Sequence, residues 1–567
     1  MLSRRALPPA ALAALCAALI APTAAHACAS PGFDPASEPP FGGQTLVLSA
    51  PLSPGTKAAG FRLTAGQATD IATKALTPSG SVRRFEVRTR TGPDSIRQWQ
   101  VDYFDPSGKD VGQVVIDDAG ACVVESWTGE QVETKLARAY RGAVAGKVNR
   151  WWIWLPLCLL FLAPFVDPRR PLRLIHLDLL ALLGFSASLF FFNKGRVELS
   201  VGLVYPVLAY VFLRMLVAGF SPIERRDRLL PFAPRGLLVA GIVALIAFHT
   251  AYVATEGKVI DVGLAGVIGA DRLTDGDDVY GEGASSGMPI RGDVYGPVNY
   301  IAYVPFEAAF PWSGRWDDVA AARAAALGFE LLTALALFGL GHRIRPGREG
   351  STLGVALAYA WLAYPFTMYT LGSSFNDGLV AFLVVCCLLV VTSAPARGAL
   401  SALAGLTKFG PLVLAPLFAA GQGDRRPRSL VLFAAGFLVA AAVVTIPLLP
   451  DGGFRELYDR SLGYQASRGS PFSVWGQAPS LHVLQTLTKV AVVGFAALLF
   501  FVPRHRSTVQ LAALAAALLI AVQVTANHWF YPYAVWFAPL VLVAVFARER
   551  GPLPPIRRAN TATARHF

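Results

Sequence analysis

Charged residues are scarce in this chain of 567 residues. Asp, Glu, Lys and Arg together make up 15% of it, hydrophobic residues make up 54%, and the mean hydropathy is +0.48. This composition excludes a soluble multidomain protein, whose surface would carry more charge, and indicates an integral membrane protein. The net charge of +13 does not indicate a nucleic-acid partner, because the basic residues occur in short runs between apolar segments rather than on one face.

Metal and nucleotide signatures are also lacking. The sequence has no His-Glu-x-x-His motif, no paired Cys-x-x-Cys and no EF-hand loop, so no metal ligands are predicted. An acidic loop can still hold a divalent cation loosely, which leaves cofactor dependence open. The lack of a phosphate-binding P-loop argues against ATP-driven transport.

The first 27 residues have the features of a signal peptide. Two arginines at positions 4 and 5 precede an apolar stretch from about residue 7 to 20, and Ala25-His26-Ala27 gives the small-x-small pattern of a cleavage site. We therefore expect an exported mature chain that begins at Cys28. Acylation of this cysteine, as in a lipoprotein, is one possible fate and a disulfide is the other.

Cysteine is rare, with six residues in the whole chain. Cys28 and Cys122 are the only two in the exported soluble region, and an oxidising compartment allows them to form a disulfide. Cys158, Cys386 and Cys387 lie in apolar segments, where cysteine usually serves as a small hydrophobic residue.

Residues 28–148 are the only long stretch with the pattern of a soluble domain. An Ala-rich run with Thr64 as N-cap predicts a helix over residues 64–75. Alternating segments predict strands of an antiparallel sheet at 84–90, 98–103, 112–117 and 122–127. The runs from Val115 to Gly120 and from Trp127 to Gln131 resemble a PepSY-type domain, which implies an α+β binding or regulatory module.

Beyond Trp151 the chain becomes a series of apolar segments, each about long enough to cross the hydrocarbon core. The predicted spans are 151–166, 174–192, 199–218, 236–254, 321–341, 353–372, 378–393, 428–448, 488–503, 508–525 and 531–547. The segment from Leu400 to Ala420 contains Lys408 and two prolines, and it would invert the topology if it crossed. We expect it to be a re-entrant hairpin that lines a protein cavity.

The basic residues give the predicted orientation. Runs such as Arg169-Arg170, Arg225-Arg226, His342–Arg345 and Arg504–Arg506 fall in the gaps expected to be cytoplasmic, as the positive-inside rule requires. The N-terminal domain is then extracytoplasmic, and the basic tail 549–567 is cytoplasmic. High Ala, Arg and Gly usage is typical of a GC-rich bacterial genome, so we expect a multi-pass protein of the bacterial cell membrane.

Two outside loops are too long to be simple connectors, at residues 254–320 and 449–487. The first contains eleven acidic residues and four basic ones. A bundle of spanning helices does not need loops of this length, so we expect function on the outer face.

Motifs in and between these loops share one pattern. Asp261 follows the fourth span and is succeeded by a short amphipathic segment that leads to Tyr280, and Tyr295 lies in a Gly-Asp-Val-Tyr-Gly-Pro run. Further motifs are Phe375-Asn376-Asp377, Thr407-Lys408, Ser470 to Gly476 with Trp475, and Asn527-His528 before the last span.

In order and spacing these motifs resemble the polytopic GT-C glycosyltransferases, most closely the DUF2029 or GT87 mannosyltransferase-like group. The resemblance covers roughly residues 236–548, so residues 232–548 would be a GT-C-like core and 149–231 three accessory transmembrane helices. One departure is Gly263, near which family members usually have an aromatic residue. The fold class predicted is a polytopic α-helical membrane protein of about eleven spans with a re-entrant hairpin and a small N-terminal α+β domain.

The resemblance implies inverting transfer of a sugar from a polyprenyl-phosphate-linked donor to a cell-envelope glycan, lipid or protein. This chemistry needs a carboxylate to accept the hydroxyl proton, and cations or hydrogen-bond donors to stabilise the leaving phosphate. The catalytic candidates are Asp261 as the general base, then Asp271, Asp293 and His528. The substrate-binding candidates are Lys408, Arg468, Tyr280, Tyr295, Asn376, Asp377, Trp475 and Asn527.

Each candidate also has a structural interpretation. A loop carboxylate can be solvated, Lys408 and Arg468 can extend toward the interface, and Asn376 and Asp377 can cap the helix that follows them. At the level of the whole chain, the alternatives to an enzyme are a transporter with a site at mid-membrane and a cell-envelope sensor that uses the PepSY-like domain.

Overall fold

The computed structural model describes residues 47–75, 82, 84–91, 97–106, 110–128, 145–169, 173–193, 196–221, 233–280, 293–312, 319–467, 470 and 472–547. The predicted signal peptide, Cys28, Arg468 and the basic tail lie outside these residues. The chain divides into two compact units, of which the first ends at Leu136 and the second begins at Ala137.

Alternating hydrophobic residues in the first unit form an antiparallel sheet, as predicted. Its strand order is β1-β2-β3-β4-β5, with β1 at Val47–Leu48, β2 at Arg84–Thr91, β3 at Arg97–Phe104, β4 at Asp110–Asp117 and β5 at Cys122–Thr128. Helix α2 (Ala65–Ala75) contributes buried alanines to a core that includes Trp99 and Val101.

Two local features secure this unit. Thr64 Oγ1 accepts a hydrogen bond from the backbone N–H of Gln67 at 3.3 Å, which confirms Thr64 as the helix cap. Cys122 is engaged in a disulfide bond; its expected partner, Cys28, lies outside the described residues.

The second unit is a bundle of apolar helices. Seven helices in the described part of the chain are long and apolar enough to cross a membrane. They are α5 (Leu174–Asn193), α6 (Val197–Phe220), α7 (Arg235–Glu256), α11 (Ala320–Ile344), α17 (Pro427–Thr445), α21 (His482–Phe501) and α22 (Thr508–Thr525). Shorter apolar helices include α4 (Trp151–Leu162), α14 (Asp377–Leu389) and α23 (Ala534–Phe546).

These helices confirm a polytopic membrane protein, with one local difference from the predicted spans. The segment expected to cross at residues 353–372 is broken into α12 (Gly347–Ala363) and α13 (Pro365–Leu371). The break falls at Pro365, because proline lacks the N–H that would continue the helical hydrogen-bond ladder.

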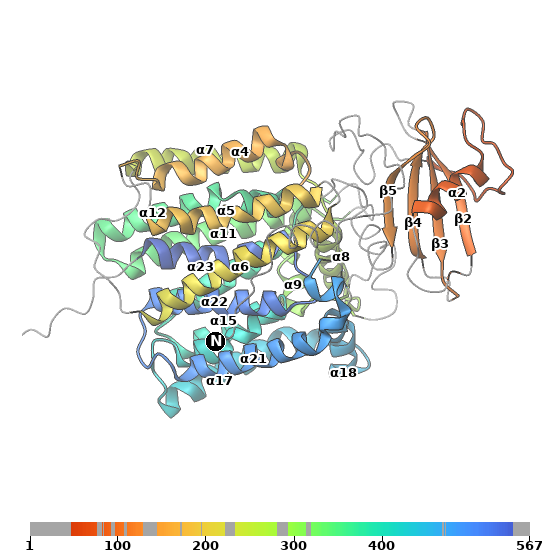
Figure 1. Cartoon of the computed structure of the whole chain (residues 1–567). Helices are drawn as coiled ribbons and strands as arrows, with labels where there is room; N and C mark the ends of the chain where they lie inside the picture. Colours follow the sequence, from red (N-terminus) through yellow and green to blue (C-terminus); the bar gives the residue numbers. More distant parts are fainter. Residues whose placement is uncertain are drawn as a thin grey trace, which may run out of the picture. The chain divides into compact units, whose positions relative to one another are not determined.

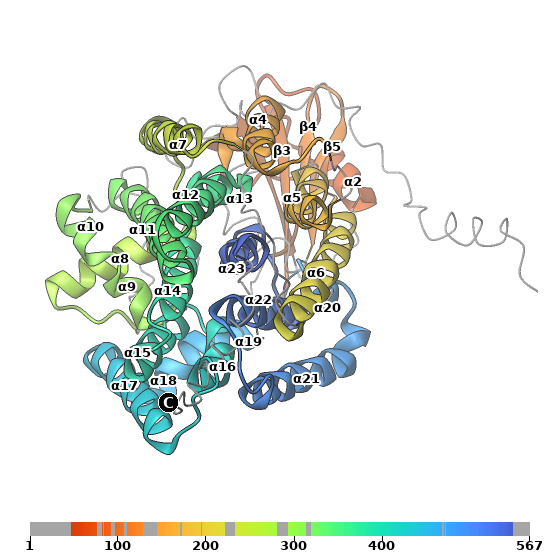
Figure 2. The same cartoon turned by 90° about the vertical axis from the view of Figure 1, so that its left-hand side faces the viewer.

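Burial separates central from peripheral helices. In α22, 83% of the most apolar stretch is buried, whereas the value for α17 and α21 is 17%. Seen along the bundle, α23 lies near its middle and α17 and α21 at its rim (Figure 2). The exposed Leu and Val side chains of α17 and α21 would therefore face lipid.

Short helices gather at one end of the bundle, which we call the loop end (Figure 1). They include α8 (Asp261–Asp275), α9 (Pro297–Ile301), α10 (Val304–Ala309) and α18 (Gly453–Tyr458). The opposite end, which we call the basic end, carries Arg425, Arg504 and Arg506. Arg425 lies at this end because it donates hydrogen bonds to the carbonyl groups at the C-terminal end of α21.

The segment predicted as a re-entrant hairpin turns back on itself at the loop end of the bundle. Helix α14 runs from the loop end, and α15 (Ala394–Gly405) returns antiparallel to it, so that Lys408 reaches Asp377. A short turn and α16 (Ala415–Ala420) then lead back to the basic end. The tip of the hairpin thus places a cation at the loop end of the bundle.

Candidate active site

Asp377 and Lys408 form a buried ion pair at the loop end. Asp377 Oδ1 accepts from Lys408 Nζ at 2.8 Å and from Trp536 Nε1 at 2.6 Å. The Lys408 ammonium also lies 5.4 Å from the centre of the Tyr533 ring, in cation–π geometry. Lys408 therefore has a carboxylate partner within the protein, and its role in binding the substrate stays a prediction.

Four neighbouring side chains have buried polar atoms that lack hydrogen-bond partners among the described residues. They are Asp377 Oδ2, Asn376 Oδ1, Asn299 Nδ2 and Tyr303 OH, and we call these four residues the unpaired polar cluster. Asn376 Nδ2 donates to Asn299 Oδ1 at 2.5 Å, which joins α14 to α9. Burial, and then the charge of Asp377, raises the pKa of Tyr303, which indicates that its hydroxyl lies close to Asp377.

An unpaired buried donor or acceptor costs about 1–3 kcal/mol, so such atoms are rare in folded proteins. This cluster mixes carboxylate, amide and hydroxyl groups, which can both donate and accept. A ligand rich in hydroxyl groups would satisfy them. The side chains of Asn376 and Asp377 make no capping hydrogen bond to α14, so the alternative interpretation as helix caps is not supported.

Asp261 begins α8 next to the segment that leads into this cluster. On one side of it, Lys258 O accepts from Ser374 Oγ at 2.8 Å, and Lys258 N donates to Gly372 O at 3.0 Å. On the other side, a Cβ on Gly263 would lie 2.7 Å from Ser374 O. A glycine at position 263 is thus required by the close approach of two backbones.

Glycines on α8 also allow two tyrosine rings to pack closely against this helix. A Cβ at Gly266 would lie 2.7 Å from the Tyr303 ring, and one at Gly269 would collide with the Tyr300 ring. Because these positions lack side chains, Tyr303 packs directly on the helix and its hydroxyl reaches the cluster.

Asp293 links the two large loops. It is 1% exposed, and its Oδ2 accepts from Arg460 Nη1 at 2.8 Å. Arg460 Nε also binds Glu456 Oε1 at 2.5 Å, one helical turn earlier. The sequence analysis did not select Arg460. Its i,i+4 spacing from Glu456, in a loop facing an acidic loop, could have indicated that it forms ion pairs.

Asp271 lies farther along α8, and burial together with Glu307 and Asp275 raises the pKa of its carboxyl group. Tyr280 and Tyr295 form hydrogen bonds within the first large loop. Tyr280 OH donates to Tyr295 O at 2.8 Å, and Tyr295 N donates to Tyr300 OH at 3.2 Å.

His528 contacts the same aromatic ring as Lys408. Its Nδ1 is 2.7 Å from Ser470 Oγ, and its ring centre is 6.0 Å from that of Tyr533, the ring that Lys408 also contacts. Asn527 and Trp475 hold the surrounding loops: Asn527 Nδ2 donates to Ala466 O at 2.9 Å and Trp475 Nε1 to Val524 O at 2.8 Å.

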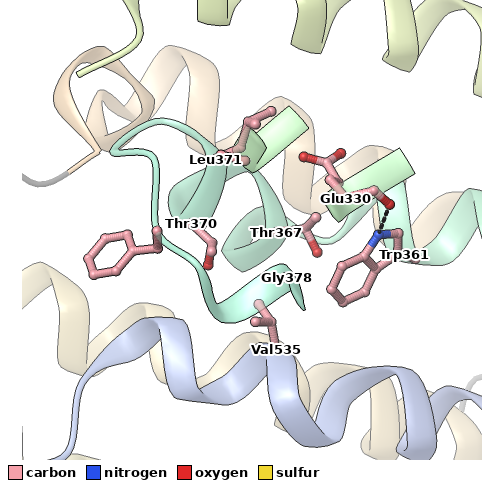
Figure 3. Close-up of a pocket in the computed structure, with 9 residues that line it drawn as sticks. Glu330, Trp361, Thr367, Thr370, Leu371, Gly378 and Val535 are labelled. Carbon is pink, nitrogen blue, oxygen red and sulfur yellow. Dashed lines mark hydrogen bonds between the residues drawn. The ribbon is translucent and has the colours of Figure 1, made fainter. Parts of the chain in front are cut away.

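A small cavity lies next to the start of α14 (Figure 3). Gly378, which follows Asp377, lines it together with Glu330 and Thr367. Its volume of about 10 Å³ is about what one water molecule needs. Glu330 Oε2 and Thr367 Oγ1 are buried and have no partner within the described ranges, and Glu330 Oε1 lies 2.5 Å from His249 Nδ1.

The fold and this site define a polytopic membrane protein with a candidate active site at the loop end of its bundle. Residues 294–547 match the model of the family described as "Glycosyltransferase family 87". This match confirms the resemblance seen in the sequence and identifies a membrane glycosyltransferase region. All four residues of the unpaired polar cluster lie inside it, as do Lys408 and His528, whereas Asp261 precedes it.

A crystal structure of ArnT from Cupriavidus metallidurans bound to undecaprenyl phosphate is similar to this chain, with a TM-score of 0.37 and 16% identity. The similarity covers 56% of this chain and 60% of that one. No curated protein matches the chain. Among the described residues, no group of three or more His, Cys, Asp or Glu side chains could hold a metal ion.

Proposed function

We propose that the chain transfers a sugar from a polyprenyl-phosphate-linked donor to a cell-envelope acceptor, with inversion and on the extracytoplasmic side. The observation that carries the proposal is the unpaired polar cluster, which lies within the region that matches glycosyltransferase family 87. A lipid-linked donor suits a site in a helix bundle whose rim helices face lipid.

The reaction is a single displacement. The oxygen of the acceptor hydroxyl attacks the anomeric carbon of the sugar, and the bond from that carbon to the phosphate oxygen breaks. The electron pair leaves with the polyprenyl phosphate, and the hydroxyl proton passes to a carboxylate. We assign this proton acceptor to Asp261, because its neighbours Lys258 and Gly263 contact the segment that leads into the cluster.

Stabilisation of the leaving phosphate is assigned to Lys408, with His528 as the second donor. An ammonium group has three donors, and Asp377 accepts from one of them. Asp377 would therefore orient Lys408 rather than compete with the phosphate for all of its hydrogens. Asp293 ranks behind Asp261 as the base, because Arg460 already binds its carboxylate.

The unpaired polar cluster would bind the hydroxyl groups of the sugar. A pyranose ring presents several hydroxyl groups, and each of them can donate and accept a hydrogen bond. The carboxylate, amide and phenol atoms of the cluster lack partners of this kind among the described residues. The hydroxyl groups of the bound sugar would supply the hydrogen-bond partners that these atoms lack.

The decisive experiment is sugar transfer by the purified full-length protein. Polyprenyl-phosphate donors labelled in mannose, glucose, arabinose or galactose would be offered with membrane extract as the acceptor. Asp261→Asn should lower transfer by about 10²–10⁴-fold, the usual contribution of a general base. Asp275→Asn, at the exposed opposite end of the same helix, should retain activity within about twofold.

Two outcomes would count against the proposal. An Asp261→Asn variant with wild-type transfer would remove Asp261 as the base but leave the enzyme class intact. A wild-type protein that neither transfers nor hydrolyses any of the four donors would contradict the glycosyltransferase itself, and transport or sensing would then be tested.

A further inference from the structure

Arg506, at the basic end of the bundle, is a buried cation whose guanidinium lacks most of its partners. Its residue is 4% exposed. Nη1 donates to Leu499 O at 2.8 Å, but Nε and Nη2 have no hydrogen-bond partner in the part of the chain that the structure describes. Within the described part of the chain, no carboxylate lies within ion-pair distance of it, and the nearby Asp424 is bound by Arg426.

Other arginines in this region are satisfied by the protein. Arg397 donates to the carbonyls of Phe418, Val391 and Ala419. Arg425 donates from Nε to Phe500 O and from Nη2 to Phe501 O. Arg506 thus differs from Arg397 and Arg425, because two of its three guanidinium nitrogens lack partners among the described residues.

The two unpaired nitrogens of Arg506 have a particular geometry. Nε and Nη2 point to the same side of the planar guanidinium, and together they form the fork that binds two oxygens of a phosphate or carboxylate. Burial, with a contribution from Arg425, lowers the pKa of Arg506 to about 10, so the group stays cationic at neutral pH. A buried cation of this kind calls for an anion.

The surroundings favour a lipid as the source of that anion. Leu498 and Phe501, on the last turn of α21, are 50% and 59% exposed and would lie against acyl chains. Arg504 and His505, on the connection that follows, are exposed as well, so their side chains can move to admit a headgroup. Basic pockets between transmembrane helices commonly bind anionic headgroups.

We propose that Arg506, between the α16–α17 and α21–α22 connections, binds the phosphate group of an anionic phospholipid at the basic end of the bundle. The phosphate accepts from Nε and Nη2, Arg425 adds positive charge, and the acyl chains lie along α21. This site is separate from the candidate active site at the loop end, and it does not depend on the proposed transfer reaction.

The test uses the purified full-length chain and its thermal unfolding midpoint. Phosphatidylglycerol should raise this midpoint in a saturable way, whereas phosphatidylcholine should not. Arg506→Met should weaken the apparent affinity for phosphatidylglycerol about tenfold or more, as loss of a bidentate charged contact predicts. Arg426→Gln, which removes the same charge from an exposed position in the neighbouring connection, should respond as the wild type does.

Arg506→Lys keeps the charge but loses the fork, so it should bind phosphatidylglycerol more weakly than the wild type. This variant also carries the test if Arg506→Met does not fold. Unchanged affinity in Arg506→Lys, or equal loss in Arg426→Gln, would overturn the site. An equal shift with inorganic phosphate would overturn the lipid assignment and leave a site for a free anion.

Discussion

At the scale of single residues, Tyr303 distinguishes a ligand site from ordinary packing. Its buried hydroxyl has no partner among the described residues, and an unpaired hydroxyl costs about 1–3 kcal/mol. Tyr303→Phe should therefore unfold at the wild-type temperature or higher. If a substrate hydroxyl is the missing partner, sugar transfer should fall about tenfold. Thermal unfolding and the transfer assay, run on the same preparation, check both parts.

Tyr280→Phe is the matched control for stability. The Tyr280 hydroxyl already donates to Tyr295 O at 2.8 Å, so its loss should destabilise the protein by about 1 kcal/mol. A destabilised Tyr303→Phe variant would mean that the Tyr303 hydroxyl is hydrogen-bonded in the free protein. The unpaired polar cluster would then lose one of its four members.

At the scale of elements, helices α5 and α6 contact the loops around His528. Tyr531 OH lies 2.8 Å from Ser188 Oγ on α5 and 2.9 Å from Ser200 Oγ on α6. Tyr205 on α6 accepts from Val474 N at 3.0 Å, in the loop that follows Ser470. These helices precede the residues that match the family model, and their contacts give them a positioning role.

Tyr531→Phe tests this role. The loss of the contacts to the two serines should destabilise the bundle by about 1–2 kcal/mol. It should also lower kcat with little change in the donor KM, because a small displacement of a catalytic donor slows chemistry more than binding. Tyr364→Phe is the control, because Tyr364 OH donates to Leu182 O on α5 at 3.0 Å and the His528 loop takes no part in that bond. Equal losses of kcat in both variants would contradict the positioning role.

Element positions could be predicted because the patterns that define them are local. Period-two alternation located β2 to β5, and the length of the apolar segments located the long helices. Hydropathy alone did not predict the break at Pro365, which follows from the missing N–H of proline. The partners within the site could not be predicted in this way. Asn299 and Asn376 are 77 positions apart, and nothing in a local pattern shows that Lys408 meets Asp377 or that Tyr303 lies beneath α8.

At the scale of the whole molecule, the second unit begins before its first apolar helix. Ala145 N donates to Ser373 Oγ, and Tyr252 OH donates to Ala145 O at 3.1 Å. Lys147 Nζ lies 2.7 Å from Glu256 Oε1. The segment after residue 145 is thus anchored to α7 and to the turn before α14, which lets the bundle fold around its own core.

Because each unit has its own hydrophobic core, the two should unfold as separate transitions. Cys122 is disulfide-bonded in the first unit, whereas Cys158, Cys386 and Cys387 in the second are free. Dithiothreitol should therefore destabilise only the first unit, by about 2–5 kcal/mol, and Cys122→Ala should reproduce the shift without responding further to the reductant. Calorimetry of the full-length protein measures both transitions. A single transition that moves as a whole on reduction would instead mean that the sheet and the bundle are coupled, because breaking a bond in one would then unfold the other.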